Sequence, residues 1–329
     1  MNNFGKLLTI LLWGCVFATL FSSCNIGRDK QEEQDRGKKI VVLSPPIYSM
    51  LKLFPSDSIN IVGTNPRTFE TAHTGLLEII DSRHHEIRTD FADRDFNVNK
   101  ETLLSFHPDI IFYYGDFQKV IADRLPILTI DVNIKQSDPE IITVEWERLL
   151  SQALKHSYAG IMEKEWQHTR KRSRELCRTI AAPKRGLFVF SYLNGRITVS
   201  GKNSYGGAFL AKAGIINVAE ELSGEKEIGK ELLYNWKPDV VFLFLGSKSA
   251  FLKDIEKKDF LSVYSIPKGI FSWGSPCVES PLMPLWLLAK SYSQVYPKDK
   301  FKDEMRRFYA NVFDKKVPDS VLNEILDDK

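Results

Sequence analysis

The chain has 329 residues, of which 43% are hydrophobic and 26% charged, the usual composition of a globular protein. This length exceeds what one hydrophobic core commonly holds, so we expect two lobes or domains. The formal net charge is only +3, from 45 basic and 42 acidic residues, and no block of Lys and Arg stands out. The charge therefore excludes a nucleic-acid-binding surface of the usual basic kind.

The first 24 residues predict a lipoprotein signal peptide. Lys6 precedes an apolar run over residues 7–21, which at about 15 residues is shorter than the roughly 20 that a membrane span needs. The run ends in Leu-Phe-Ser-Ser before Cys24, which resembles a lipoprotein processing site, although Phe21 replaces the usual Leu, Val or Ile. In such proteins the Cys is acylated and becomes the first mature residue. The alternative is an uncleaved N-terminal anchor, and both place the folded part outside the cytoplasm.

Residues 25–38 are polar and predict a disordered tether. Its acidic centre, residues 31–35, resembles export signals of some surface lipoproteins, so the membrane and leaflet that hold the anchor stay open. Two further cysteines, Cys177 and Cys277, form either one disulfide or two buried thiols. No Cys/His cluster predicts a metal site.

Residues 39–138 read as an N-terminal α/β lobe. Short apolar runs that predict buried strands cover residues 39–43, 59–63, 109–114 and 127–132. Helical patterns lie between them, at residues 48–54 and 100–106. This alternation favours a mostly parallel sheet.

Residues 139–182 read as linking helices. Apolar residues recur at helical spacing from Trp146 to Leu154, and Ser157 is placed to cap a second helix over residues 157–180. Such a helix would be about 35 Å long, enough to cross a domain.

The α/β pattern returns in residues 183–329, which predict a C-terminal lobe. The expected strands or short apolar runs cover residues 186–190, 197–200, 240–245, 263–266 and 270–273, and the expected helices cover residues 203–213, 282–296 and 301–312.

The two lobes share a quasi-repeat. Residues 101–112 (ETLLSFHPDIIF) match residues 231–242 (ELLYNWKPDVVF), each with a Glu, an apolar helix, Pro-Asp and a buried strand. Proline ends the helix, because it lacks an N–H and restricts the residue before it. The sequence therefore predicts two Rossmann-like α/β lobes joined by a single long backbone helix.

On these residues, and on the segments 41–45, 126–132, 207–217 and 273–290, the chain resembles the periplasmic solute-binding proteins of ABC importers for iron complexes and vitamin B12. The resemblance covers about residues 39–313. It implies a ligand cleft between the lobes, at the loops that follow the strands. The residues expected to contact the ligand are Ser44, Tyr48, Asn65, Arg67, Tyr114, Tyr192, Tyr205 and Trp273.

The resemblance also implies partners. In this family one surface Glu of each lobe docks into an Arg pocket of a permease subunit, and the matching positions here are Glu101 and Glu231. We expect a lipid-anchored monomer that faces the periplasm and delivers a metal chelate, namely haem, an iron–siderophore or a corrinoid.

Three alternatives remain at this point. Molybdate or tungstate would be a cargo of the same fold, and would need backbone N–H groups at helix N-termini more than aromatic side chains. A surface lipoprotein that serves no permease is the second. An enzyme with Cys277 or Ser191 as nucleophile is the third, and the sequence disfavours it because it contains no recognisable catalytic motif. We therefore expect no catalytic residue and no cofactor.

Overall fold

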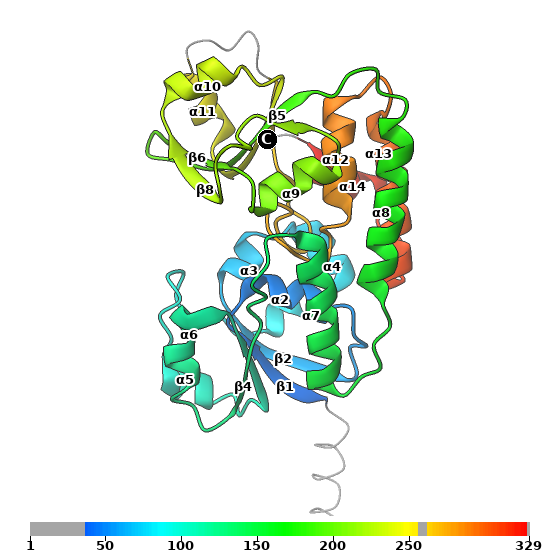
Figure 1. The fold of residues 1–329 in the computed structure, drawn as a ribbon. Helices are drawn as coiled ribbons and strands as arrows, with labels where there is room; N and C mark the ends of the chain where they lie inside the picture. The colour runs from blue at the N-terminus through cyan, green and yellow to red at the C-terminus, as the bar shows by residue number, and fades with distance from the viewer. Residues whose placement is uncertain (1–36, 256–261, 328–329) are drawn as a thin grey trace, which may run out of the picture.

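The computed structural model describes residues 37–255 and 262–327, which form two α/β lobes joined by a pair of helices (Figure 1). The predicted two-lobed fold is confirmed. The predicted signal peptide, Cys24 and the tether as far as residue 36 lie outside the described residues. Within the described part of the chain, no helix is both long and apolar enough to cross a membrane.

Lobe one is built on a four-stranded parallel sheet with the strand order β2-β1-β3-β4. The strands are β1 (Lys38–Val42), β2 (Ile59–Thr64), β3 (Ile110–Tyr113) and β4 (Leu128–Asp131). The three apolar residues of β1 and all four residues of β3 are buried, as expected for strands covered on both faces. The helices of this lobe are α2 (Pro45–Leu51), α3 (Arg67–Glu70), α4 (Thr74–Ile80), α5 (Lys100–Leu104) and α6 (Gly115–Ala122), with a 3₁₀ turn, η1, at His84–Glu86.

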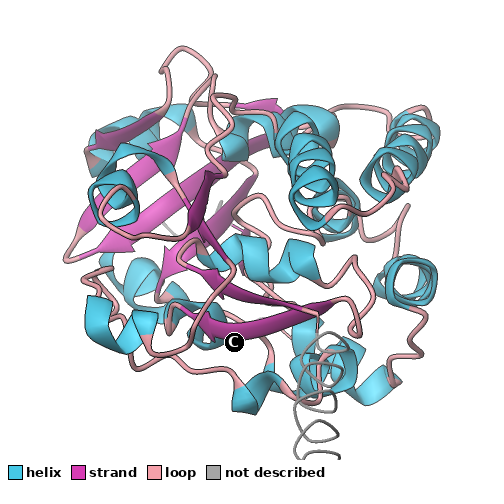
Figure 2. Ribbon diagram, turned by 90° about the horizontal axis from the view of Figure 1, so that it is seen from below, coloured by secondary structure: helices cyan, strands magenta, loops and turns pink. Residues whose placement is uncertain are grey.

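Lobe two has a mixed sheet with the order β10-β9-β5-β6-β8, and β7 also pairs with β5. Its strands are β5 (Arg185–Leu193), β6 (Arg196–Ser200), β7 (Ile216–Asn217), β8 (Glu225–Ile228), β9 (Val240–Gly246) and β10 (Ser262–Ser265). Its helices are α9 (Tyr205–Lys212), α10 (Lys230–Trp236), α11 (Lys248–Asp254), α12 (Leu282–Ser291), α13 (Lys298–Phe313) and α14 (Asp319–Leu326). Seen from below, helices lie on both sides of the strands (Figure 2).

Two helices link the lobes, α7 (Pro139–Leu154) and α8 (Ile161–Cys177), and α8 stands upright along one side of the molecule (Figure 1). The predicted start of the second helix at Ser157 is wrong, because the helix begins four residues later. Gly160 occupies the N-cap in the left-handed region (φ 65°) and offers no side-chain cap. Instead the buried carboxylate of Glu147 accepts hydrogen bonds from the backbone N–H of Ile161 (2.9 Å) and Met162 (2.8 Å).

The quasi-repeat is a repeat of structure as well as sequence. Asp109 accepts a hydrogen bond from the backbone N–H of Lys39 at 2.8 Å, and Asp239 accepts one from Arg185 at 2.7 Å. Each aspartate also donates its own N–H back to the same partner residue, at 2.8 and 2.7 Å. The Pro-Asp pair thus follows a helix and attaches the next strand to the first strand of its lobe, in both lobes alike.

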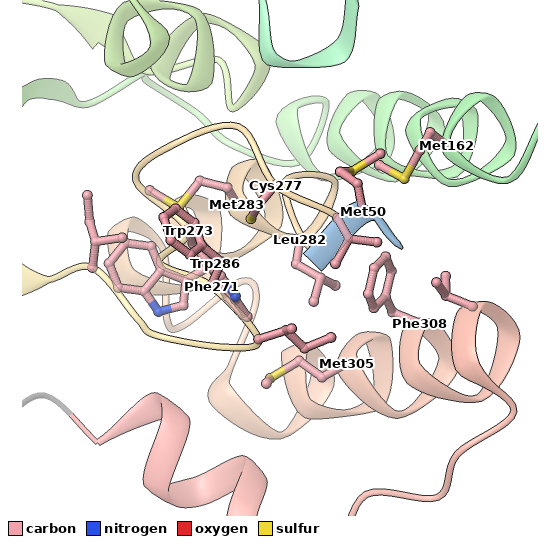
Figure 3. Close-up of a cluster of buried hydrophobic side chains, with 14 of the residues drawn as sticks. Met50, Met162, Phe271, Trp273, Cys277, Leu282, Met283, Trp286, Met305 and Phe308 are labelled. Atoms are coloured by element: carbon pink, nitrogen blue, oxygen red, sulfur yellow. The ribbon is translucent and has the colours of Figure 1, made fainter. Parts of the chain in front are cut away.

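The lobes share one hydrophobic core. Met50 of α2, Met162 of α8 and Phe308 of α13 belong to the same buried cluster, together with Trp273 and Cys277 (Figure 3). The last two lie in residues 266–281, the segment between β10 and α12, which we call the strap. The strap touches lobe one directly, since the N–H of His73 donates to the carbonyl of Gly269 at 2.7 Å. The N–H of Val278 donates to the Ser49 hydroxyl at 3.2 Å.

Other sequence expectations need correction. Residues 270–273 form no regular strand but belong to the strap, whose apolar residues are buried by packing rather than by pairing in a sheet. The helix expected over residues 282–296 ends at Ser291. α14 and the short helices α3, α4, α6 and α11 were not predicted, because their apolar patterns are too brief to show a period. Cys177 and Cys277 are both free thiols.

Candidate functional site

Two of the predicted ligand residues meet between the lobes. Tyr114 directly follows β3 of lobe one, and Tyr205 opens α9 of lobe two. Burial raises the pKa of Tyr205, and the neighbouring Tyr114 side chain and the charge of Glu225 raise it further, so Tyr205 stays neutral. Because both side chains are only half-buried, they lie where a ligand between the lobes can reach them.

Arg67 is exposed at the start of α3, which follows β2. Its Nε donates to the backbone carbonyl of Arg94 at 2.6 Å, and its guanidinium lies 5.7 Å from the ring centre of Phe96. About half of the side chain (49%) remains accessible, and the exposed Asp95 carboxylate is 3.8 Å away. Arg67 therefore keeps a solvent-facing cation beside an aromatic ring.

The other predicted residues of lobe one are buried and have structural partners. The Tyr48 hydroxyl donates to Asp81 at 2.7 Å in the core, where burial raises the pKa of Tyr48. Asn65 accepts from the N–H of Arg67 at 2.9 Å and donates to the carbonyl of Asp93 at 3.1 Å. Ser44 is 3% exposed at the N-cap of α2. None of these three side chains offers a surface to a ligand in this structure.

The same holds for two predicted residues of lobe two. Tyr192 is buried against Phe251 and donates a hydrogen bond to Asp254; burial and this bond raise the pKa of Tyr192 to about 12. Trp273 is fully buried in the strap and contacts the ring of Phe301. The structure thus leaves Tyr114, Tyr205 and Arg67 at least partly accessible, and keeps these two in the core.

Sequence reasoning missed two aromatic side chains next to this group. Phe117 lies three residues beyond Tyr114 on α6 and is 59% exposed. Phe96 lies in the loop before α5, and its ring is 5.6 Å from that of Phe117 in an edge-to-face arrangement. The available signal was an isolated aromatic in each of two polar segments, Asp-Phe-Asn and Asp-Phe-Gln. Phe117 lies in α6, which directly follows β3, whereas Phe96 lies in the loop before α5.

Glu101 and Glu231 occupy equivalent places. Each lies in the first turn of its helix, α5 or α10, with an exposed side chain. Position by position, residues 101–110 and 231–240 alternate between buried and exposed in the same order. The two carboxylates are therefore presented in the same way on the two lobes.

Two described pockets lie away from the paired tyrosines. One of about 770 Å³ is lined by the outer edge of β2, by residues 80–88 and by the end of α13. Another of about 280 Å³ lies between α8 and α9 and includes Trp166, Ser173 and Lys212. Neither contains a predicted ligand residue. Across residues 37–255 and 262–327 there is no group of three or more His, Cys, Asp or Glu side chains that could hold a metal ion.

Comparison with known proteins identifies a family and several solved structures that share this architecture. The family model described as "Periplasmic binding protein" matches residues 92–263, more than half of the chain. A periplasmic solute binding protein from Veillonella parvula is 20% identical, with a TM-score of 0.71 over 89% of this chain and 92% of that one. CeuE from Helicobacter pylori, solved with Ni(II) bound, is 19% identical, with a TM-score of 0.67 over 88% and 94%.

The molybdate periplasmic binding protein MolA from Haemophilus influenzae is 18% identical, with a TM-score of 0.63 over 86% of this chain and 95% of that one. No curated protein sequence matches the chain. At these identities the solved structures show a common fold and nothing about cargo. The family match is independent of them and extends across β3, the linking helices and most of lobe two, so the chain belongs to the periplasmic binding protein family.

Proposed function

We propose that this chain is the lipid-anchored substrate-binding component of an ABC importer, and that it captures a metal complex between its lobes and delivers it to the permease. The observation that carries the proposal is the matched presentation of Glu101 and Glu231 on two equivalent lobes. A carboxylate held in the first turn of a helix is fixed in position and can pair bidentately with arginine. Two such groups suit a permease made of two similar subunits.

The proposed cargo is haem, an iron–siderophore or a corrinoid, bound near Tyr114, Tyr205 and Arg67. Half-buried aromatic hydroxyls and an exposed guanidinium suit a large ligand with flat and anionic parts. Structural relatives include proteins described as binding haem and molybdate. Molybdate is therefore the competing cargo that a binding experiment must include.

Binding is measured by absorbance and calorimetry on the chain without residues 1–24, with haemin, cobalamin, a ferric siderophore and molybdate. One-to-one binding at micromolar or lower Kd by a metal complex supports the proposal. Binding of molybdate alone would reassign the cargo, and silence across the panel would contradict the proposed cargo class.

Replacing Glu101 or Glu231 by Ala is expected to lower uptake at least tenfold and to leave the ligand Kd unchanged. Removing one partner of a close charge pair at an interface typically costs about 2–5 kcal/mol, which exceeds a tenfold effect. Uptake is measured in cells that depend on this protein. Glu86→Ala in lobe one and Glu221→Ala in lobe two are the matched controls, since both remove an exposed carboxylate elsewhere. Normal uptake by both docking variants would favour a surface lipoprotein that serves no permease.

Cys24→Ser is expected to abolish lipidation, so that the protein leaves the membrane fraction. An acyl anchor contributes membrane affinity in proportion to its buried CH₂ groups, and no other anchor is proposed for the mature chain. Detergent partitioning with labelled fatty acid checks both points. A variant that stays in the membrane fraction would instead support the uncleaved N-terminal anchor.

A further inference from the structure

We infer that the pocket between the C-terminal half of α8 and the end of α9 binds a phosphate group, as a second site that is separate from the cargo site. The pocket has a volume of about 280 Å³, and none of the predicted ligand residues lines it. One water takes up roughly 30 Å³ in the liquid, so the pocket has room for a phosphate group and several waters. The site needs neither the cargo nor the permease.

The first observation is a local excess of positive charge. Residues 170–185 contain seven basic side chains and one acidic side chain, although the whole chain has a net charge of only +3. Three of these cations, Lys171, Arg174 and Arg178, follow one another at spacings of three and four residues, so they lie on one side of the helix. We call these three residues the basic stripe. The balanced total, from which no basic surface was expected, conceals it.

The basic stripe is not neutralised by the protein. All three side chains are exposed, and in the described parts of the chain, 37–255 and 262–327, none of them forms an ion pair. Two neighbouring cations of α8 are paired, Arg170 with Glu140 and Arg172 with Glu304 at 3.2 Å. Like charges three or four residues apart destabilise a helix. The stripe therefore costs stability in the free protein, and an anion bound to it would remove that cost.

Compensation of the helix dipoles explains only part of this charge. α8 ends at Cys177 and α9 ends at Lys212, and the C-terminal turn of a helix favours nearby cations. Arg174 and Lys212 stand in these last turns and serve that purpose. Lys171 lies nearly two turns before the end of α8, beyond the range of the effect. The basic stripe thus extends further than the helix end requires.

The second observation is an unsatisfied hydroxyl beside the stripe. Ser173 is 4% exposed and lines the pocket. Its Oγ has no hydrogen-bond partner among the described residues, which is unfavourable for a buried hydroxyl. A phosphate oxygen would accept this hydrogen bond. Arg174, the next residue along α8, lines the same pocket and can pair bidentately with the same group.

The other walls of the pocket also suit an anion. Lys212 lines it from α9, where Asp138 (3.0 Å) and Glu140 (2.8 Å) hold its Nζ in place. Burial raises the pKa of the Cys177 thiol, so this wall stays neutral and does not repel an anion. A phosphate carries close to two negative charges and three acceptor oxygens, more than a carboxylate offers to the same donors. The phosphate belongs either to a soluble compound or to the headgroup of an anionic lipid.

Alkylation of Cys177 by iodoacetamide tests the pocket. The chain without residues 1–24 keeps two cysteines, and the other, Cys277, is completely buried. Sodium phosphate is expected to slow the alkylation of Cys177 at least threefold, compared with sodium chloride at the same ionic strength. Arg174→Gln and Ser173→Ala should each weaken this protection at least twofold. Lys164→Gln is the matched control, because it removes an exposed cation near the start of the same helix, and it should leave the protection unchanged.

Sedimentation with vesicles separates the two sources of phosphate. The same unacylated chain is mixed with vesicles of anionic phosphatidylglycerol or of phosphatidylcholine, whose headgroup has no net charge. If the phosphate is that of a lipid, the chain binds only the anionic vesicles. The variant that combines Lys171→Gln, Arg174→Gln and Arg178→Gln should then bind them at least tenfold more weakly, since each cation near an anionic surface contributes to binding.

The outcomes decide between the sources or reject the site. Protection of Cys177 by phosphate without vesicle binding assigns the pocket to a soluble phosphate compound. Absence of both effects would overturn the inference, as would equal behaviour of the stripe variant and Lys164→Gln in both experiments. The stripe variant should keep the cargo affinity of the wild type, so failure here leaves the proposed receptor function untouched.

Discussion

The free energy of unfolding is expected to fall by roughly 3 kcal/mol between pH 5 and pH 8 in the wild-type chain, relative to the Glu279→Gln variant. Glu279 is completely buried in the strap. Its carboxylate accepts hydrogen bonds from the N–H of Ile270 (2.7 Å) and Phe271 (3.3 Å) and from the Tyr309 hydroxyl (2.5 Å). These bonds favour the anion, but burial is the larger influence and raises the pKa of Glu279 to about 7.

The sign follows from proton binding. In the unfolded chain Glu279 titrates near its ordinary pKa of 4.5, whereas in the folded chain it keeps its proton up to about pH 7. Between these values the folded state binds more protons, so stability decreases as the pH rises and levels off above pH 7. A pKa difference of this size corresponds to roughly 3 kcal/mol, at about 1.4 kcal/mol per unit.

Urea unfolding of both proteins at several pH values measures the effect. Glutamine keeps the size of the side chain and an oxygen that accepts from Ile270, but carries no charge to desolvate. Glu145→Gln, which changes a carboxylate with 45% exposure on α7, should retain the wild-type slope. Parallel stability curves for wild type and Glu279→Gln would contradict the prediction.

Ionisation of Glu279 affects more than the strap, because the strap contacts lobe one beside this carboxylate. Gly269 lies so close that a Cβ there would come within 2.0 Å of the carboxylate, and the carbonyl of Gly269 accepts from His73 of lobe one. Burial, and after it the Glu279 carboxylate, raises the pKa of Tyr309 on α13 and of the Cys277 thiol in the strap, so both neighbours stay neutral. Ionisation therefore places a charge inside the core that joins the lobes.

Sequence patterns predicted the elements whose signal is local. The Glu-helix-Pro-Asp-strand repeat identified both lobes, because each of its residues has a backbone role that the structure makes explicit through Asp109 and Asp239. The alternation of apolar runs likewise predicted β1, β3, β5 and β9. Chain order and turn chemistry suffice for such elements.

The candidate site was harder to predict, because tertiary packing decides whether a given side chain is buried or exposed. Tyr48 lies in α2 and Trp273 in the strap, and both side chains are fully buried, Trp273 against the ring of Phe301 on α13. Phe96 was overlooked for the opposite reason. Its loop is charged and reads as solvated, yet the structure places its ring against that of Phe117.

Replacing Glu147 by Ala is expected to destabilise the protein by about 3 kcal/mol, because it removes the cap of the linking helix α8. Glu147 is 2% exposed on α7, and both of its carboxylate oxygens accept backbone N–H groups at the start of α8. Met162, one of the two donors, is fully buried, so no water can replace the lost acceptor. An unpaired buried donor costs about 1–3 kcal/mol. The start of α8 would also lose the charged acceptor that caps its first two N–H groups.

The measurement is urea unfolding at pH 7, with coincident transitions by two probes to establish two-state behaviour. Glu145→Ala is the control on the same helix; its partner Arg148 is 3.6 Å away at the surface, so its loss should cost less than about 0.5 kcal/mol. Glu147→Gln keeps one acceptor oxygen and should fall between the two. Equal stability of Glu147→Ala and Glu145→Ala would show that α8 is held by its packing against α12 and Met50 alone. A large loss of unfolding free energy in Glu147→Ala would mean that the helical link between the lobes depends on this one carboxylate. A single substitution there would then destabilise the core that both lobes share.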